Sequence, residues 1–208
     1  EIKRLTDDVW ATCINDAATL INEYQKDIAA FTTQFDSFLN GYKEIVFVGI
    51  NLSDYGKGTD YSLPDALALA EKYDNIKRVR LGSLEPDHIT REMIEKLGKL
   101  KKLCPQFHIS LQSGSNSVLK KMNRHYTAEE YKTLTENLRD VFPAATITTD
   151  ILTGFPTETE EEFIETVEFA KEIKFEKAHI FPYSVREGTK AATLPQLTNA
   201  VKESQNFN

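Results

Sequence analysis

Cysteine is scarce in this chain of 208 residues, which holds only Cys13 and Cys104. Two thiols so far apart predict neither a disulfide framework nor the closely spaced ligands of a metal site. Long apolar runs are missing as well, since no segment reaches the roughly 20 apolar residues that cross a bilayer. The opening sequence EIKRLTDDVW also lacks an apolar signal core. We therefore expect a protein with no membrane partner that works in the cytoplasm.

Positive charge is also in short supply, and the net charge is -7. Phosphate binding depends on clustered lysine and arginine, so this balance argues against a nucleic-acid surface that covers the whole chain. A local basic patch stays open. The 40% hydrophobic and 27% charged content is typical of one ordinary globular domain with a buried core, rather than of a disordered chain.

Strand-like and helix-like segments alternate from residue 44 onward. Segments rich in β-branched and aromatic residues are 44–50, 77–83, 107–113, 146–153 and 177–183. Helical spacing of apolar residues covers 64–72, 88–103, 128–141 and 160–173. The last two of these helices begin with capping boxes, Thr127 with Glu130 and Thr159 with Glu162. Strand followed by helix, repeated, predicts parallel strands joined by right-handed crossovers.

The two ends of the chain differ from this repeat. Residues 1–43 read as one long helix or two consecutive helices that end near Gly41. Residues 191–208 read as a tail, with a loop followed by a short helix. We expect three parts: a helical segment 1–43, an α/β unit 44–190 and the tail.

Polar residues take every second position in four successive strands. Arg78 and Arg80 share a face in the second strand, and His108, Ser110 and Gln112 share one in the third. The later strands continue the pattern with Thr146, Thr148, Asp150 and His179. If the apolar faces pack under helices, the polar faces meet in a ligand-holding interior. The alternative is a buried ion pair of Arg80 with Asp150, with His108 and His179 as hydrogen-bonded core residues.

The strand ends form a second group of candidates, because ligands of α/β folds lie at the carboxyl ends of the strands. Glycines that permit close approach recur there: Gly49, Gly82, Gly114, Gly154 and Gly188. Polar groups follow them: Asn51, Glu85, Gln112, Ser113 and Glu158. The turn 154–156 leads into a helix whose own glutamates already face its amino terminus, which argues against phosphate there. The alternative that a carboxylate of this turn binds an amine or a ribose hydroxyl of a ligand is not excluded by this argument.

These strand-end motifs, taken in order, resemble the radical S-adenosylmethionine (SAM) enzymes, specifically the tRNA methylthiotransferases. The matching segments are NGYKEIVFVGINLSDYG, IKRVRLGSLEPDHIT, FHISLQSGSNSVLKKMNRHYTAEEY, ITTDILTGFPTETEEEF and HIFPYSVREGTKAATLPQ. The branch that modifies threonylcarbamoyl-adenosine beside the anticodon is the most similar. The resemblance implies an α/β fold, a partial (βα) TIM-like barrel of the radical SAM type, with SAM and a [4Fe-4S] cluster as cofactors and tRNA as partner.

The resemblance also implies roles for individual residues. The cofactor pocket would include Gly49, Asn51, Ser83, Glu85, Gln112, Ser113, Asp150, Gly154, Glu158 and Arg186. The RNA-binding residues would be Lys120, Lys121 and Arg124. The family usually has glycine where Thr157 stands, which we expect to crowd the turn. It holds its cluster with three cysteines spaced C-x3-C-x2-C, a set that Cys13 and Cys104 do not form, so no metal ligand is predicted.

Three functions follow from these patterns. The first is the catalytic barrel of a tRNA methylthiotransferase, unable to perform radical chemistry alone. The second is a barrel without a cluster that serves as a scaffold, or a truncated or engineered chain. Here the apolar residues of segment 9–38 would cover the open strand edge at 44–50. The third, a barrel lyase or aldolase, is disfavoured because no strand-end lysine is placed for a Schiff base.

Overall fold

The computed structural model describes residues 41–49 and 51–205. The helical prediction for residues 1–40, the cover that segment 9–38 would form over the open edge, and Cys13 all lie outside the described residues. Within the described part, no helix combines the length and the apolar character that a bilayer span requires.

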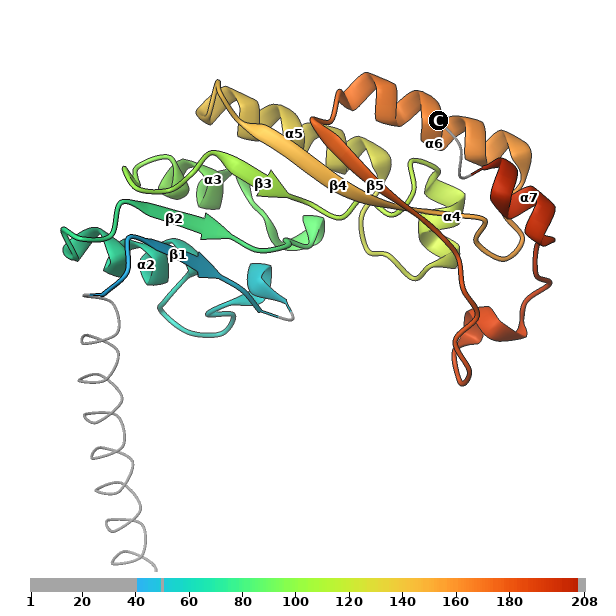
Figure 1. Cartoon of the computed structure of the whole chain (residues 1–208), viewed down its shortest axis with the longest axis horizontal. Coiled ribbons are helices and arrows are strands. Elements are labelled where there is room, and N and C mark those ends of the chain that lie inside the picture. The colour runs from blue at the N-terminus through green and yellow to red at the C-terminus, as the bar shows by residue number, and fades with distance from the viewer. Residues whose placement is uncertain (1–40, 50, 206–208) are drawn as a thin grey trace, which may run out of the picture.

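Five short strands form the sheet layer, and all their pairings are parallel. The strands are β1 (Glu44–Phe47), β2 (Arg78–Leu81), β3 (Gln106–His108), β4 (Thr146–Thr153) and β5 (Lys177–Pro182). β1 pairs with β2, and β3, β4 and β5 pair in that order. Isolated parallel bridges, Val79 with Leu103 and Leu84 with Ile109, connect the two sheets. The predicted order of parallel strands is therefore confirmed (Figure 1).

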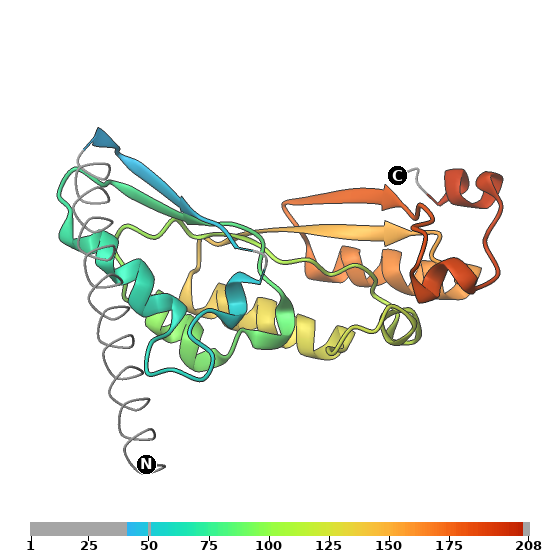
Figure 2. The same cartoon turned by 90° about the horizontal axis from the view of Figure 1, so that it is seen from below.

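In the described part, the helices lie along one side of the strands, except for the last one, which lies beyond the strand ends (Figure 2). The α-helices are α2 (Leu63–Ala68), α3 (Arg91–Leu97), α4 (Asn116–Lys121), α5 (Ala128–Val141), α6 (Glu160–Ile173) and α7 (Asn199–Ser204). Short 3-10 turns are η1 (Leu52–Asp54), η2 (Leu69–Lys72), η3 (Pro86–His88) and η4 (Lys190–Thr193). Both predicted capping boxes are present and fix the starts of α5 and α6. The helix predicted at 88–103 is shorter, since Gly98 ends α3.

The strands alternate in burial as their sequences predict. In β4 the odd-numbered residues Ile147, Thr149, Ile151 and Thr153 are buried, and the even-numbered residues are half-buried. In β2, Val79 and Leu81 are buried while Arg78 and Arg80 are exposed. The core therefore fills the space between strands and helices, around fully buried Phe107, Ile109 and Tyr131. The other face, which we call the inner face, carries the polar residues and has no helix over it in the described part (Figure 2).

Candidate functional site

A polar cluster lies on the inner face of β3, β4 and β5. The imidazole of His108 contacts Thr148 Oγ1 through Nδ1 at 2.9 Å and Asp150 Oδ2 through Nε2 at 3.2 Å. In the neutral ring, Nε2–H then donates to the carboxylate and Nδ1 accepts from the threonine hydroxyl. His179 is the register partner of Asp150, and its ring centroid lies 6.2 Å from that of His108. The sequence predicted that the polar faces of four strands share one interior, and contacts between polar side chains join three of them here, β3, β4 and β5.

The alternative ion pair between Arg80 and Asp150 is wrong. Arg80 Nε lies 3.0 Å from Glu44 Oε1, and Arg78 Nε binds the second oxygen of the same carboxylate. The hydrogen bond from Arg78 is the main cause that lowers the pKa of Glu44 below its ordinary value. Arg80 is held at the β1–β2 end of the layer because its register partner, Val46, lies two residues from Glu44.

Glu85 and Arg124 meet at the carboxyl-end rim. Arg124 Nη1 donates to Glu85 Oε2 at 2.9 Å, and both side chains are about one-third exposed. The buried Ser53 hydroxyl accepts from the Glu85 backbone N–H and donates to the Glu85 carbonyl. The sequence assigned Glu85 to a cofactor and Arg124 to RNA, and the structure brings the two together. Ser53 gave no signal in the sequence.

The loop after β3 is held from below by tyrosines. Tyr131 donates to the Ile109 carbonyl at 2.8 Å, and Tyr126 donates to the carbonyls of Ser110 and Leu111. Burial is the main cause that raises the pKa of both phenols well above the ordinary value. The tyrosines thus satisfy the carbonyls of this segment, while the N–H groups of Ile109 and Gln112 still bond to β4. Neither tyrosine was predicted from the sequence.

Gln112 and Ser113 take different roles in this loop. Gln112 adopts a left-handed conformation with φ 66°, and its backbone bonds to Asp150 and Leu152 of β4. Ser113 is fully buried, and its hydroxyl bonds Thr166 Oγ1 of α6 at 3.0 Å. The Ser113 side chain therefore faces α6, whereas Gln112 fixes the path of the rim.

The turn after β4 encloses a buried carboxylate. Glu158 is 5% exposed, and its Oε2 accepts from the Gly154 N–H at 2.7 Å. Burial raises the pKa of Glu158 to about 7, although the N–H groups of Gly154 and Phe155 lower it in part. Glu158 thus binds its own loop, and Gly154, with φ 67°, packs against the Lys202 side chain of α7. Glu158 is not exposed to a ligand as the strand-end pattern suggested.

Thr157 has a positive φ of 68°. A β-branched residue is disfavoured in this left-handed region, where glycine is at ease. The expected effect of threonine at this position was crowding of the turn. The structure gives a different physical reason, which is backbone strain.

The remaining predicted residues are dispersed. Lys121 Nζ binds Glu162 Oε1 at 2.9 Å and the Thr157 carbonyl at 3.3 Å, so it ties α4 to α6. Partial burial raises the pKa of Glu162, but hydrogen bonds from Ser117 and Lys121 outweigh it and leave the pKa lowered. Asn51 donates to Asp54 Oδ2. Six of the predicted residues are exposed: Gly49, Asn51, Ser83, Lys120, Lys121 and Arg186.

The residues of this chain do not fit a [4Fe-4S] cluster by themselves. Such clusters are held by cysteine thiolates, and the whole sequence has two cysteines. Cys104 is a half-buried free thiol beside β2, where its N–H bonds the Val79 carbonyl. Among the described residues, no group of three or more His, Cys, Asp or Glu side chains is placed to hold a metal ion.

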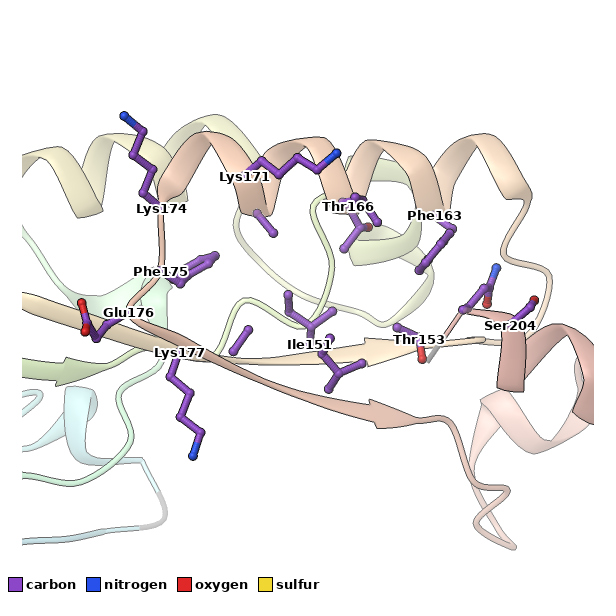
Figure 3. Close-up of a pocket in the computed structure, with 15 residues that line it drawn as sticks. Ile151, Thr153, Phe163, Thr166, Lys171, Lys174, Phe175, Glu176, Lys177 and Ser204 are labelled. Atoms are coloured by element: carbon purple, nitrogen blue, oxygen red, sulfur yellow. The ribbon is translucent and has the colours of Figure 1, made fainter. Parts of the chain in front are cut away.

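A cavity of about 620 Å³ lies on the helix side of β4 and β5. Figure 3 shows Phe163 and Thr166 reaching from α6 toward Ile151 and Thr153, while Lys174 and Lys177 point away. None of the residues predicted from the sequence lines this cavity. The candidate site is therefore the inner face and its rim.

Comparisons with known proteins identify the family. A family model described as the Radical SAM superfamily matches residues 13–170, a range that includes part of the amino-terminal segment. The tRNA-2-methylthio-N(6)-dimethylallyladenosine synthase of Pelotomaculum thermopropionicum is 40% identical over 168 residues, which cover 79% of this chain and 38% of that protein. Threonylcarbamoyladenosine tRNA methylthiotransferase MtaB of Bacillus subtilis is 46% identical over 156 residues, 74% of this chain and 35% of that protein. The chain thus spans little more than a third of these relatives.

Solved structures support the fold. Coproporphyrinogen III oxidase (HemN) from Escherichia coli, a radical SAM enzyme, superposes with a TM-score of 0.63 at 16% identity, covering 78% of this chain and 38% of that one. The radical SAM methyltransferase TsrM from Kitasatospora setae gives 0.57 at 16% identity, covering 74% and 30%. At such identities the likeness concerns the fold alone, and it agrees with a partial barrel of this type.

Proposed function

Because the chain belongs to the radical SAM superfamily, we propose that it is the catalytic-barrel portion of a tRNA methylthiotransferase that acts on a modified adenosine near the anticodon. The observation that carries the proposal is the polar inner face, where His108, Asp150 and His179 converge from three strands. Both relatives named above are tRNA-modifying enzymes by name. The identities to the two kinds of enzyme overlap, so the choice of the threonylcarbamoyladenosine branch rests on the strand-end motifs.

SAM binds, in this proposal, at the rim formed by the strand ends. Glu85 and Asn51 offer a carboxylate and an amide, and Gly49 leaves room near the backbone. Arg124 is paired with Glu85 in the structure and would have to leave this partner to bind a carboxylate of the cofactor. In the superfamily, a [4Fe-4S] cluster supplies the electron that cleaves SAM. Since this chain has two cysteines, we derive no step through the cluster and propose that the chain alone is inactive.

RNA approaches, in this proposal, from the side of α4. Lys120 is exposed there, and Arg124 lies beside it on the rim. The groove between α5 and α6 is unsuited to phosphate, because carboxylates dominate its lining: Glu129, Glu162, Glu165, Glu168 and Glu172. Lys121 is already bound to Glu162 and contributes mainly to structure. The compartment that fits a tRNA partner is the cytoplasm.

The second candidate function is a scaffold without catalysis. The burial of Glu158 and the Glu85–Arg124 pair favour it, because both groups bind this chain itself. The two functions differ in SAM binding, which a scaffold does not need.

The test combines iron and sulfide analysis with titration calorimetry after anaerobic reconstitution of the chain. We expect far fewer than the roughly four irons of a complete cluster, together with measurable and similar binding of SAM and S-adenosylhomocysteine, since no iron chelates the SAM methionyl group. Glu85→Gln should weaken both ligands, while Glu92→Gln on α3 serves as a matched control. About four irons with equal sulfide would contradict the proposal that the chain alone is inactive. Absence of binding of either ligand would favour the scaffold.

A further inference from the structure

A groove of about 910 Å³ lies between α5 and α6, which are neighbours on the helix side of the sheet (Figure 1). The residues just before and at the start of α4, 114–117, also line it. The charged residues of its lining are five glutamates and one lysine: Glu129, Glu162, Glu165, Glu168, Glu172 and Lys132. None of the residues assigned to SAM or RNA belongs to this lining, so the groove is separate from both of those surfaces.

A row of α6 glutamates runs along the groove. Its members are three or four positions apart, a spacing that places them on one face of a helix: Glu162, Glu165, Glu168 and Glu172. At a helical rise of about 1.5 Å per residue, the row is roughly 15 Å long. Carboxylates at this spacing repel one another, so the row favours an elongated ligand that carries several positive charges.

Lysines neutralise the two ends of the row. Lys121 Nζ of α4 lies 2.9 Å from Glu162 Oε1 at the start. Lys132 of α5 forms an ion pair with Glu172 at the end. These pairs tie α6 to α4 and to α5, and so they mark the two ends of the groove.

The middle of the row is less well compensated. Glu165 is exposed, and among the described residues its carboxylate has no hydrogen bond or ion pair. Glu129, across the groove on α5, accepts from the neutral amide of Asn116 at 2.9 Å, and this bond is the main cause that lowers the pKa of Glu129. Glu168 pairs with Lys171, but both side chains are about two-thirds exposed, and ion pairs so exposed are weak. The middle of the groove therefore has free acceptors for a cation.

An unpartnered hydroxyl lies at the bottom of this middle section. Ser115 lines the groove and is 1% exposed, and in the part of the chain that the structure describes its Oγ has no hydrogen-bond partner. Serine before a helix usually caps it, yet Ser115 precedes α4 without a side-chain cap bond. The N–H of neighbouring Gly114 donates to Thr166 Oγ1, beside Glu165 on α6. Burial of a polar atom without a partner is unfavourable, so this hydroxyl indicates a ligand that bonds to it.

These groups select a linear polyamine. Ionised carboxylates accept hydrogen bonds and donate none, and a polyamine presents ammonium donors at short alkyl intervals. Its alkyl segments can lie against Phe169 and Ala128, the apolar residues of the lining. A basic peptide fits less well, because its backbone carbonyls need donors and the backbone of the flanking helices is bonded internally. Within residues 41–49 and 51–205, no group of three His, Cys, Asp or Glu side chains is placed for a metal ion.

We propose that the groove between α5 and α6 binds a linear polyamine, with ammonium groups on Glu129 and Glu165 and one N–H donated to Ser115 Oγ. The site is independent of SAM and RNA binding, since no residue assigned to either lines it.

The test is calorimetric titration of the chain with spermidine at low salt, with a short lysine peptide as the competing probe. Ser115→Ala removes the hydroxyl without a change of charge and should weaken spermidine binding about 3- to 10-fold. Glu165→Gln should weaken it about 2- to 5-fold. The matched control is Glu161→Gln, which removes the same charge from an exposed position of α6 outside the groove. Its affinity should stay within about 1.5-fold of that of the unchanged chain.

Four outcomes would overturn the inference. Spermidine binding that cannot be measured removes the site altogether. Equal weakening by Glu161→Gln and Glu165→Gln would show that spermidine responds only to the overall negative charge. Unchanged affinity in Ser115→Ala, with thermal melting showing it folded, would show that the hydroxyl takes no part. Tighter binding of the lysine peptide than of spermidine would assign the groove to a basic protein segment.

The exposed position of Glu165 keeps the test decisive if alanine at the buried Ser115 disturbs the loop, because the comparison with Glu161→Gln then stands by itself. Neither SAM nor RNA enters these titrations. Failure of the inference therefore leaves the proposed function in place.

Discussion

The carboxylate of Glu158 accepts a hydrogen bond from the backbone N–H of Gly154, so the turn between β4 and α6 closes on its own side chain. Burial raises the pKa of Glu158 from 4.5 to about 7. The folded protein thus keeps this proton up to about pH 7, whereas the unfolded chain releases it near pH 4.5. Stability contributed by the bound proton is full below pH 4.5 and is lost as the pH rises through 7.

Glu158→Gln should remove this pH dependence, because the amide is neutral throughout. Between pH 5 and pH 8, we expect the unfolding free energy of the unchanged chain to fall by up to about 3 kcal/mol. Urea denaturation at each pH measures it. The unfolding free energy of the variant should change less with pH, and its gain over the unchanged chain should be largest at pH 8. Glu161→Gln, at an exposed position of α6, is the control. Parallel profiles for the variant and the unchanged chain would contradict the assignment.

Thr157→Gly should stabilise the protein. The threonine holds a left-handed φ of 68°, which costs about 1–2 kcal/mol for a residue with a Cβ, while glycine loses part of this gain through its flexible unfolded state. We expect a net gain of about 0.5–1 kcal/mol, measured by chemical denaturation. The stability of Thr157→Asn should lie between that of the unchanged chain and that of Thr157→Gly, since asparagine tolerates this conformation. A loss of stability in the glycine variant would show that threonine contacts outweigh the strain.

Gly114→Ala should destabilise the contact of the loop after β3 with α6. A Cβ at this position would lie 2.7 Å from Phe169 Cβ and 2.9 Å from Thr166 Cα, distances that force the helix to move. Overpacking of this kind costs about 1–3 kcal/mol, and calorimetric melting measures it. Gly41→Ala, where a Cβ meets nothing within 4 Å, should change little. Equal melting temperatures for both variants would disprove the close approach.

Two adjacent lysines should separate structure from RNA binding. Lys121 binds Glu162, so Lys121→Met should lower stability by up to about 1 kcal/mol. Lys120 is exposed, so Lys120→Gln should leave stability unchanged and reduce the salt dependence of RNA binding by about 0.7–0.9 in log–log slope. Denaturation and salt titrations measure the two effects. The same salt slope in Lys120→Gln and the unchanged chain would remove Lys120 from the RNA surface.

The helices and strands are well predicted from the sequence, because alternation and capping motifs depend on residues that are close together in the chain. Alternation in 146–153 places Asp150 opposite Ile151, and the capping motif at Thr159 marks the start of α6, as the structure confirms. The tail was expected to end in a short helix, and α7 is that helix.

The ion-pair partners of side chains on different strands are harder to predict. The alternative drawn from the sequence paired Arg80 with Asp150, whereas the register of β1 on β2 brings Arg80 to Glu44. The inward turn of Glu158 depends on the backbone path of its loop, which composition does not specify. The assignment of Glu158, Ser113 and the other rim residues to SAM stays a prediction.

The parallel pairing of the strands has a consequence for how the chain folds. No pair in the described part can form as a local hairpin, because each requires a helical crossover to be traversed first. Loop closure before strand pairing predicts slow, non-local folding. The β4–α6–β5 unit has six registered pairs and a capped helix, whereas β1 and β2 share four. We expect pulse-labelled amides of β4 and β5 to gain protection first, and earlier protection of β1 and β2 would place the folding nucleus at the other end.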